Sequence, residues 1–298
     1  MVGIFQHEAV NFWLTNRIPR RLANRLMARI SRIEQPLFAR AAIAIWRLFG
    51  DLDLSESATQ HFASVHACFT RELKPGARPI DADPRVIVSP CDAIVGACGP
   101  IPGDALIQAK GLRYTLGELL IDPLLAARYR DGQYATLRLT SGMYHRFHAP
   151  YECVVEQVTY IPGDTWNVNP STLARIPKVF CKNERAIISA RLESHDTVVA
   201  IVAVAAILVG SIRLNFLSFV LNLHDRGEAE IRCRAPFIKG QEIGWFEHGS
   251  TIIVFAPNGV VLCDAVREGA VIRMGQPLMR LPTPPSGCGA AAQGTTDR

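Results

Sequence analysis

The fold class is decided by the stretch Val198-Val199-Ala200-Ile201-Val202-Ala203-Val204-Ala205-Ala206-Ile207-Leu208-Val209-Gly210, the longest apolar run in the chain. Its thirteen residues are too few for a helix that spans a bilayer, which needs about 20 residues. The run is rich in valine and isoleucine, as is a strand that is buried on both faces. We therefore predict a central β-strand here, in preference to a membrane helix.

Shorter apolar runs on both sides of this stretch are separated by glycine and proline turns, which is typical of a mainly β domain. We expect strands at residues 86–88, 135–139, 153–158, 186–190, 197–207, 252–255 and 260–262. The last two runs bracket Ala256-Pro257-Asn258-Gly259, and Asn-Gly between apolar runs predicts a hairpin. The predicted fold class is α+β, with a mainly antiparallel β core within residues 63–282 and amphipathic helices before it.

Residues 1–62 form the predicted helical region, which carries an excess of positive charge. Between residues 11 and 50 eight arginines stand against one acid, Glu34, and apolar side chains recur at helical spacing. The arginines are at 17, 20, 21, 25, 29, 32, 40 and 47, and the apolar residues are Ile18, Leu22, Leu26, Ile30, Ile33 and Leu37. Pro36 breaks this pattern into two helices. Such helices either lie on an anionic membrane surface or pack on the domain with their charges in water, and the residues alone favour neither alternative.

The composition argues against several other classes of protein. Residues 1–16 lack the cationic start, apolar run and small-residue cleavage site of a secretory signal. The eight cysteines contain no Cys-x-x-Cys pair, so we expect reduced thiols and no metal site. No nucleic-acid motif accompanies the arginines, so we expect no nucleic-acid partner. Residues 283–298 show no apolar periodicity and are expected to form a disordered tail.

The tetrapeptide His248-Gly249-Ser250-Thr251 places a hydroxyl directly after a glycine, which leaves the Gly249 carbonyl open to attack. Asp92 and His148 are of the residue types that activate a serine. A second pair, Gly210-Ser211, lies inside a long strand pattern, where a distorted peptide is hard to place. Ser250 instead opens a predicted strand, so it is the better candidate of the two.

The other candidate residues each have a simpler structural reading. His145 and His148, three residues apart, would by themselves be core or surface histidines more often than catalytic ones. Asp92 follows Ser-Pro-Cys and fits a turn. Asn167 and Asn169 follow Pro-Gly-Asp and either bind a phosphate or shape a loop.

Five segments, in their order and spacing, resemble the pyruvoyl-dependent phosphatidylserine decarboxylases. They are Ser89-Pro90-Cys91-Asp92, Tyr144-His145-Arg146-Phe147-His148-Ala149-Pro150, Tyr160-Ile161-Pro162-Gly163-Asp164, Lys239-Gly240-Gln241-Glu242-Ile243-Gly244 and His248-Gly249-Ser250-Thr251. The likeness runs from about Phe69 to about Leu281. The resemblance implies a proenzyme that cuts itself at Gly249–Ser250 into chains 1–249 and 250–298. It also implies a covalent pyruvoyl group derived from Ser250, with no external cofactor.

The resemblance assigns a role to each site residue. His148 is the base that activates Ser250, Asp92 orients His148, and His145 returns a proton to the substrate after carbon dioxide leaves. The pyruvoyl ketone would condense with the amine of phosphatidylserine and so lead to phosphatidylethanolamine. The implied partners are phosphatidylserine, an anionic membrane surface at the cytoplasmic face of the cell membrane, and the other fragment, with two such heterodimers forming a dimer.

Two departures from the family pattern stand close to these residues. His248 replaces the leucine that usually precedes Gly-Ser-Thr, and Cys91-Asp92-Ala93 replaces Ala-Asp-Gly, which could shift the turn that aims Asp92. Two rival functions stay open. One is a serine hydrolase that uses Asp92, His148 and Ser250 on external esters, and the other is a β carrier or lipid-binding module without enzymatic activity. A chain that stays uncleaved would favour either rival.

Overall fold

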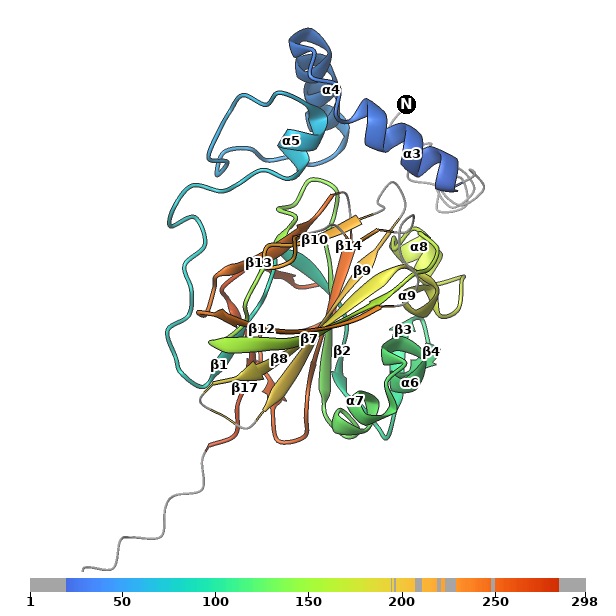
Figure 1. Ribbon diagram of the computed structural model, residues 1–298, viewed down its shortest axis with the longest axis vertical. Coiled ribbons are helices and arrows are strands. Elements are labelled where there is room, and N and C mark those ends of the chain that lie inside the picture. The colour runs from blue at the N-terminus through green and yellow to red at the C-terminus, as the bar shows by residue number, and fades with distance from the viewer. Residues whose placement is uncertain are drawn as a thin grey trace, which may run out of the picture.

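The structure is a computed structural model that describes residues 20–193, 195, 197–206, 211–218, 221–222, 229–247 and 250–283. Its centre is an eight-stranded sheet with the strand order β12-β7-β8-β9-β14-β5-β2-β16 (Figure 1). These strands are β2 Ala93–Pro100, β5 Gln133–Arg138, β7 Cys153–Ile161, β8 Arg185–Leu192, β9 Val198–Ala205, β12 Ala229–Phe237, β14 Ser250–Ala256 and β16 Val271–Ile272. All neighbouring pairs in this sheet are antiparallel, which confirms the predicted mainly antiparallel β core.

Three smaller sheets and seven helices complete the described part of the chain. The sheet orders are β1-β17-β15, β11-β10-β13-β6 and β3-β4. Their strands are β1 Val86–Val88, β3 Ala105–Ala109, β4 Leu112–Thr115, β6 Arg146–His148, β10 Ser211–Leu214, β11 Leu221–Asn222, β13 Glu242–Phe246, β15 Val261–Leu262 and β17 Pro277–Arg280. The helices are α3 Arg20–Ile30, α4 Pro36–Phe49, α5 Val65–Phe69, α6 Leu116–Leu120, α7 Pro123–Arg128, α8 Pro170–Leu173 and α9 Val179–Lys182.

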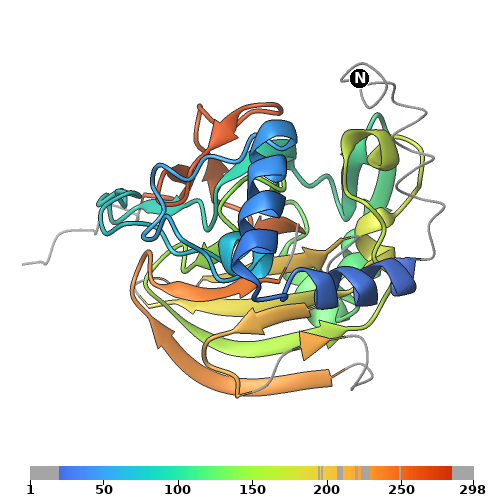
Figure 2. The ribbon, with the colours of Figure 1, turned by 90° about the horizontal axis from the view of Figure 1, so that it is seen from above.

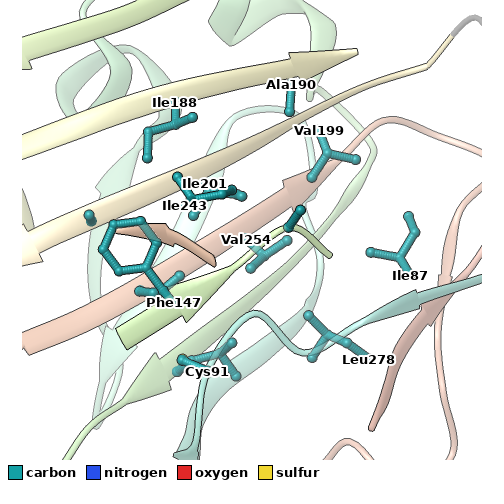
Figure 3. Close-up of a cluster of buried hydrophobic side chains, with 14 of the residues drawn as sticks. Ile87, Cys91, Phe147, Ile188, Ala190, Val199, Ile201, Ile243, Val254 and Leu278 are labelled. Atoms are coloured by element: carbon teal, nitrogen blue, oxygen red, sulfur yellow. The ribbon is translucent and has the colours of Figure 1, made fainter. Parts of the chain in front are cut away.

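Strand β9 forms the middle of the core, and all eight of its residues are buried. Val199 and Ile201 pack into one apolar cluster with Phe147 of β6 and Ile243 of β13 (Figure 3). Val202, one residue further along, packs into a second cluster on the opposite face, with side chains of α6, α9 and the β3-β4 sheet. The strand is therefore covered on both faces, as its valine-rich and isoleucine-rich sequence predicts. Residues 207–210 of the same apolar run lie outside the described residues.

The N-terminal helices α3, α4 and α5 lie together above one end of the β core (Figures 1 and 2). Pro36 occupies the first turn of α4, where its missing N–H costs no hydrogen bond, so the predicted break is a helix start. Helix α4 is anchored by Ile43, which packs with Leu52 and Leu54, and by Trp46, whose ring stacks on Phe69 at 6.0 Å. Within the described part of the chain, none of the helices is long and apolar enough to cross a membrane.

The predicted hairpin across residues 252–262 is wrong. Asn258 and Gly259 do form a turn, and the φ of +93° at Gly259 favours glycine. However, β14 pairs with β5 and β9, whereas β15 pairs with β17 in a different sheet. Both edges of β14 are already occupied, so the chain that leaves the turn has no free edge to pair with.

The two ends of the chain fall largely outside the described residues. Residues 1–19 belong to the predicted helical region, and residues 284–298 to the predicted tail. Seven of the eight cysteines are described, and each is a free thiol. Cys68, Cys91 and Cys153 are buried among apolar side chains, as small core residues are expected to be.

Candidate active site

Asp92 lies in the short loop between β1 and β2 and is almost fully buried. Its carboxylate accepts hydrogen bonds from Arg78, through Nε at 2.9 Å and through a terminal guanidinium nitrogen at 2.6 Å. It also accepts a hydrogen bond from the backbone N–H of Met274 at 2.9 Å. Ser89 supports the loop, since its hydroxyl donates to the carbonyl of Cys91 at 2.8 Å. These contacts hold the carboxylate of Asp92 in a fixed position, paired with Arg78.

His148 is the last residue of β6, and both nitrogens of its ring have partners. Nδ1 lies 2.9 Å from the carbonyl oxygen of Gly240, which can only accept a hydrogen bond, so Nδ1 carries the proton. Nε2 then accepts a hydrogen bond from the hydroxyl of Tyr144 at 3.0 Å. Burial lowers the pKa of His148 below its usual value. The ring is therefore neutral at pH 7, and its unprotonated Nε2 faces the hydroxyl of Tyr144.

The backbone brings the Asp92 loop and β6 side by side, because the N–H of His148 donates to the carbonyl of Pro90 at 2.8 Å. The two side chains nevertheless have different partners. Among the described residues, Arg78 and Met274 hold the carboxylate of Asp92, while Gly240 and Tyr144 hold the ring of His148. The role of Asp92 as the residue that orients His148 stays a prediction.

His145 precedes β6 and is completely buried. Its Nδ1 donates to the carbonyl of Met143 at 2.8 Å, and its ring packs on Phe69 of α5 with centroids 3.9 Å apart. Its carbonyl accepts from the N–H of Phe246, the last residue of β13, at 3.1 Å. The residue predicted to act on the substrate therefore lies beside the strand that leads into the Gly-Ser motif.

Ser250 begins β14 and pairs with Ala205 of β9, which confirms that this serine opens a strand. Strand β13 ends at Phe246 and β14 begins at Ser250, so the Gly249–Ser250 peptide lies at the start of β14. His248 and Gly249 themselves lie outside the described residues. Ser211 was expected inside a long strand, and this expectation is wrong, because β9 ends at Ala205 and Ser211 begins β10. Position within a strand therefore does not distinguish the two Gly-Ser pairs.

Asn167 and Asn169 shape the loop before α8. The side chain of Asn169 caps this helix by accepting from the N–H of Thr172 at 2.8 Å. The side chain of Asn167 accepts from the N–H of Asn169 at 2.9 Å. Both side chains therefore have a structural role in this loop. Substrate binding by Asn167 and Asn169 stays a prediction.

Three partners of the site residues had no predicted role. Tyr144 and Gly240 lie within the segments that carry the family resemblance, so their position was a usable signal. Arg78 has no such signal, because it lies 14 residues before Asp92 and only the fold brings the two side chains together. Within the described residues, no group of histidine, cysteine or acidic side chains could hold a metal ion.

Comparisons with known proteins identify the family to which the chain belongs. A family profile described as phosphatidylserine decarboxylase matches residues 65–280. A phosphatidylserine decarboxylase proenzyme of Halorhodospira halophila is 39% identical over 286 residues, covering 92% of this chain and 94% of the relative. The proenzyme of Pseudomonas entomophila is 35% identical over 277 residues, covering 88% and 94%. The proenzyme of Aliivibrio fischeri is 37% identical over 230 residues, covering 74% and 79%. The chain belongs to the phosphatidylserine decarboxylase family.

Proposed function

We propose that this chain is the proenzyme of a phosphatidylserine decarboxylase, which cuts itself at Gly249–Ser250 and converts phosphatidylserine to phosphatidylethanolamine. The observation that carries the proposal is the family match over residues 65–280, which includes the Gly-Ser motif, Asp92 and both site histidines. The same match argues against a serine hydrolase and against a carrier without activity, because the relatives are named decarboxylase proenzymes. The intact mass of the purified protein tests the proposal, since cleavage gives chains of 249 and 49 residues (298 − 249 = 49).

Self-cleavage begins when the hydroxyl of Ser250 gives its proton to Nε2 of His148. Oγ bonds to the carbonyl carbon of Gly249 as the amide C–N bond breaks, and the freed nitrogen takes up the proton. The two chains are then joined by an ester. Removal of the α-proton of residue 250 breaks the Cβ–Oγ bond and releases the Gly249 carboxylate. Water then hydrolyses the resulting dehydroalanine. Its nitrogen leaves as ammonia, and the ketone that remains is the pyruvoyl group.

The residues around position 250 fit the pyruvoyl group that this sequence of steps creates. A neutral, buried histidine lies on β6, whose neighbour β13 leads into the motif, and His145 lies against the end of β13. When present, the group supplies a ketone that accepts electrons from the amino acid head group during loss of carbon dioxide. His145 would hold the proton that returns to the substrate, and Asp92, whose loop is held by Arg78, would orient His148.

The pH dependence of self-cleavage should follow the neutral form of His148. Burial lowers its pKa, so the base form predominates at pH 7 and is lost only on acidification below the usual value of about 6.5. We expect a constant cleavage rate from pH 7 to pH 8 and a falling rate below about pH 6. The measurement is a gel time course of freshly translated precursor in buffers of equal ionic strength. A rate that already halves between pH 8 and pH 7 would contradict His148 as the base.

The N-terminal helices provide the surface that we propose for membrane contact. One face of α4 carries exposed apolar side chains at Leu37, Ile45 and Leu48, which are 72%, 58% and 78% exposed. Positions 37, 41, 45 and 48 share one face of a helix. Leu26 of α3 is also exposed, at 55%. Exposed apolar residues next to arginines are the composition of a helix that inserts into an anionic lipid surface.

A groove of about 400 Å³ beside α4 adds positive charge to this surface. Among the described residues, Arg40 and Arg47 line it against a single acidic residue, Glu34, and Phe62 contributes an apolar side chain. Each basic residue near an anionic leaflet contributes about 1 kcal/mol, which salt screens over about 8–10 Å. Membrane attachment should therefore have a salt-sensitive and a salt-resistant part.

Vesicle binding should separate these two parts. Leu37→Ser with Leu48→Ser should weaken binding to phosphatidylserine vesicles roughly tenfold or more, at high as well as low salt, because apolar insertion is lost. Arg40→Gln with Arg47→Gln should remove the salt-sensitive part. Leu124→Ser is the matched control, since Leu124 is 84% exposed on α7 at the far end of the molecule (Figure 1). Cosedimentation measures all three proteins, and binding that neither pair of changes alters would place the membrane surface elsewhere.

Three further parts of the proposal concern organisation. Residues 1–62 form the membrane-associating region and residues 63–282 the catalytic domain. Two heterodimers of chains 1–249 and 250–298 associate as a dimer, which analytical ultracentrifugation measures. The protein acts at the cytoplasmic face of the cell membrane, which protease accessibility in spheroplasts measures.

A further inference from the structure

Glu247 is a buried acidic residue that lies between β13 and the Gly-Ser motif, two positions before Gly249. Its side chain is 8% exposed, and its carboxylate accepts hydrogen bonds from Arg32 at 2.6 Å and from His66 at 2.5 Å. These partners come from the turn after α3 and from α5, 215 and 181 residues earlier in the chain. A buried carboxylate is costly unless it is paired, so the three side chains stabilise one another. We call them the Arg32–His66–Glu247 cluster.

The carboxylate of Glu247 stays ionised at neutral pH. Burial alone would raise its pKa, but the hydrogen bonds and charges of His66 and Arg32 outweigh burial and lower it to about 2. At neutral pH, Arg32 and His66 therefore contact a charged carboxylate. The two partners of Glu247 are also held next to each other. The backbone N–H of His66 donates to the carbonyl of the buried Ser31, the neighbour of Arg32, at 2.8 Å.

The cluster fixes one end of the segment that contains the scissile peptide. On that side Phe246 donates to the carbonyl of His145, and Glu247 is held by its two partners. On the other side the backbone of Ser250 pairs with Ala205 in the central sheet. Only three residue steps separate Glu247 from Ser250, a span of at most about 10 Å. The cleavage site thus lies on a short length of chain between two anchored residues, Glu247 and Ser250.

We propose that Glu247, held by Arg32 and His66, is a positioning residue for self-cleavage at Gly249–Ser250. This inference rests on the proposed function, because it requires that the chain cuts itself there. Attack of a side-chain oxygen on the preceding carbonyl needs a restricted backbone geometry, and a segment tied at both ends reaches it more often than a free one. The N-terminal helical region thereby becomes part of the cleavage apparatus, although it contributes no group to the reacting atoms.

The test is the rate at which freshly translated full-length precursor splits, followed on a gel. Glu247→Gln keeps the shape of the side chain but removes its charge, and should slow cleavage roughly tenfold or more, the scale of weakened charge-assisted hydrogen bonds. Glu247→Asp keeps the carboxylate and should recover part of the rate. The matched control is Glu156→Gln, which removes the ion pair of Glu156 with Arg191 (2.7 Å) on the large sheet and should cleave at the wild-type rate. Thermal melting of each precursor, measured in a Ser250→Ala background, separates slower cleavage from loss of folding.

Arg32→Gln and His66→Gln should each slow cleavage as well, and neither should slow the Glu247→Gln protein further, because contacting residues are not additive. Glu247→Gln protein that is folded and cleaves at the wild-type rate would overturn the inference. If Glu247→Gln does not fold, Arg32→Gln decides, because Arg32 is 56% exposed and its removal spares the core. A wild-type rate in that variant also overturns the inference. Wild-type precursor that never splits would instead refute the proposed function. That result is distinct from the others, because the cluster is intact in the wild-type protein.

Discussion

Replacing Ser250 with alanine should leave a single chain of 298 residues with no decarboxylase activity. Alanine has no oxygen to attack the carbonyl of Gly249, so the ester cannot form and no pyruvoyl group can appear. Activity should be lost to the limit of detection, because the group that accepts the electrons during decarboxylation is never made. Intact-mass spectrometry reports the chain length, and release of carbon dioxide from carboxyl-labelled phosphatidylserine reports the activity.

The chain supplies its own control for this substitution. Gly210-Ser211 is a second Gly-Ser pair, and Ser211 begins β10 as Ser250 begins β14. Ser211→Ala should therefore split at Gly249–Ser250 like the wild type and keep its activity. Full activity in protein that has not split would refute self-cleavage as the source of the active group.

The sequence predicts the central strands well because their environment is uniform. Strand β9 is buried on both faces, so nearly every residue in it is apolar and the run is visible without any partner. Strand β12 was missed for the opposite reason. It lies at the edge of the sheet, and its exposed Glu230, Arg232 and Arg234 alternate with partly buried residues, so it contains no apolar run. Period-2 alternation was the signal that could have found it.

The hairpin error shows what a local pattern leaves out. Asn258-Gly259 correctly predicts a turn, but pairing depends on which sheet edges are free, and β5 and β9 already occupy both edges of β14. The same limit applies around the site. The resemblance names Asp92, His145, His148 and Ser250 through short motifs. Contacts such as Arg78 with Asp92, or Arg32 with Glu247, join residues that no motif connects.

The two site histidines should separate maturation from turnover. His148 is neutral because burial lowers its pKa, and its Nδ1 proton is fixed by Gly240, so Nε2 can serve as the base for Ser250. His148→Ala should therefore stay uncleaved and inactive. His145→Gln, which preserves volume beneath Phe69, should cleave but lose most decarboxylation, about 100-fold or more for a missing proton donor. A gel and a carbon dioxide assay on each variant measure the two steps.

Asp92 needs a stricter comparison, because its removal also takes one of two carboxylate partners from the buried guanidinium of Arg78, which then keeps, among the described residues, only Glu56. Asp92→Asn should block cleavage if the carboxylate itself serves the reaction. Arg78→Gln breaks the same ion pair, together with the ion pair of Arg78 with Glu56, but keeps the carboxylate of Asp92. It therefore shows what loss of these contacts does to the loop while the carboxylate is present. Cleavage in Arg78→Gln with none in Asp92→Asn would assign the effect to the carboxylate, whereas equal loss in both would reduce Asp92 to a structural anchor. Cleaved, active His148→Ala would refute His148 as the base, and His145, beside the end of β13, would then be the next candidate.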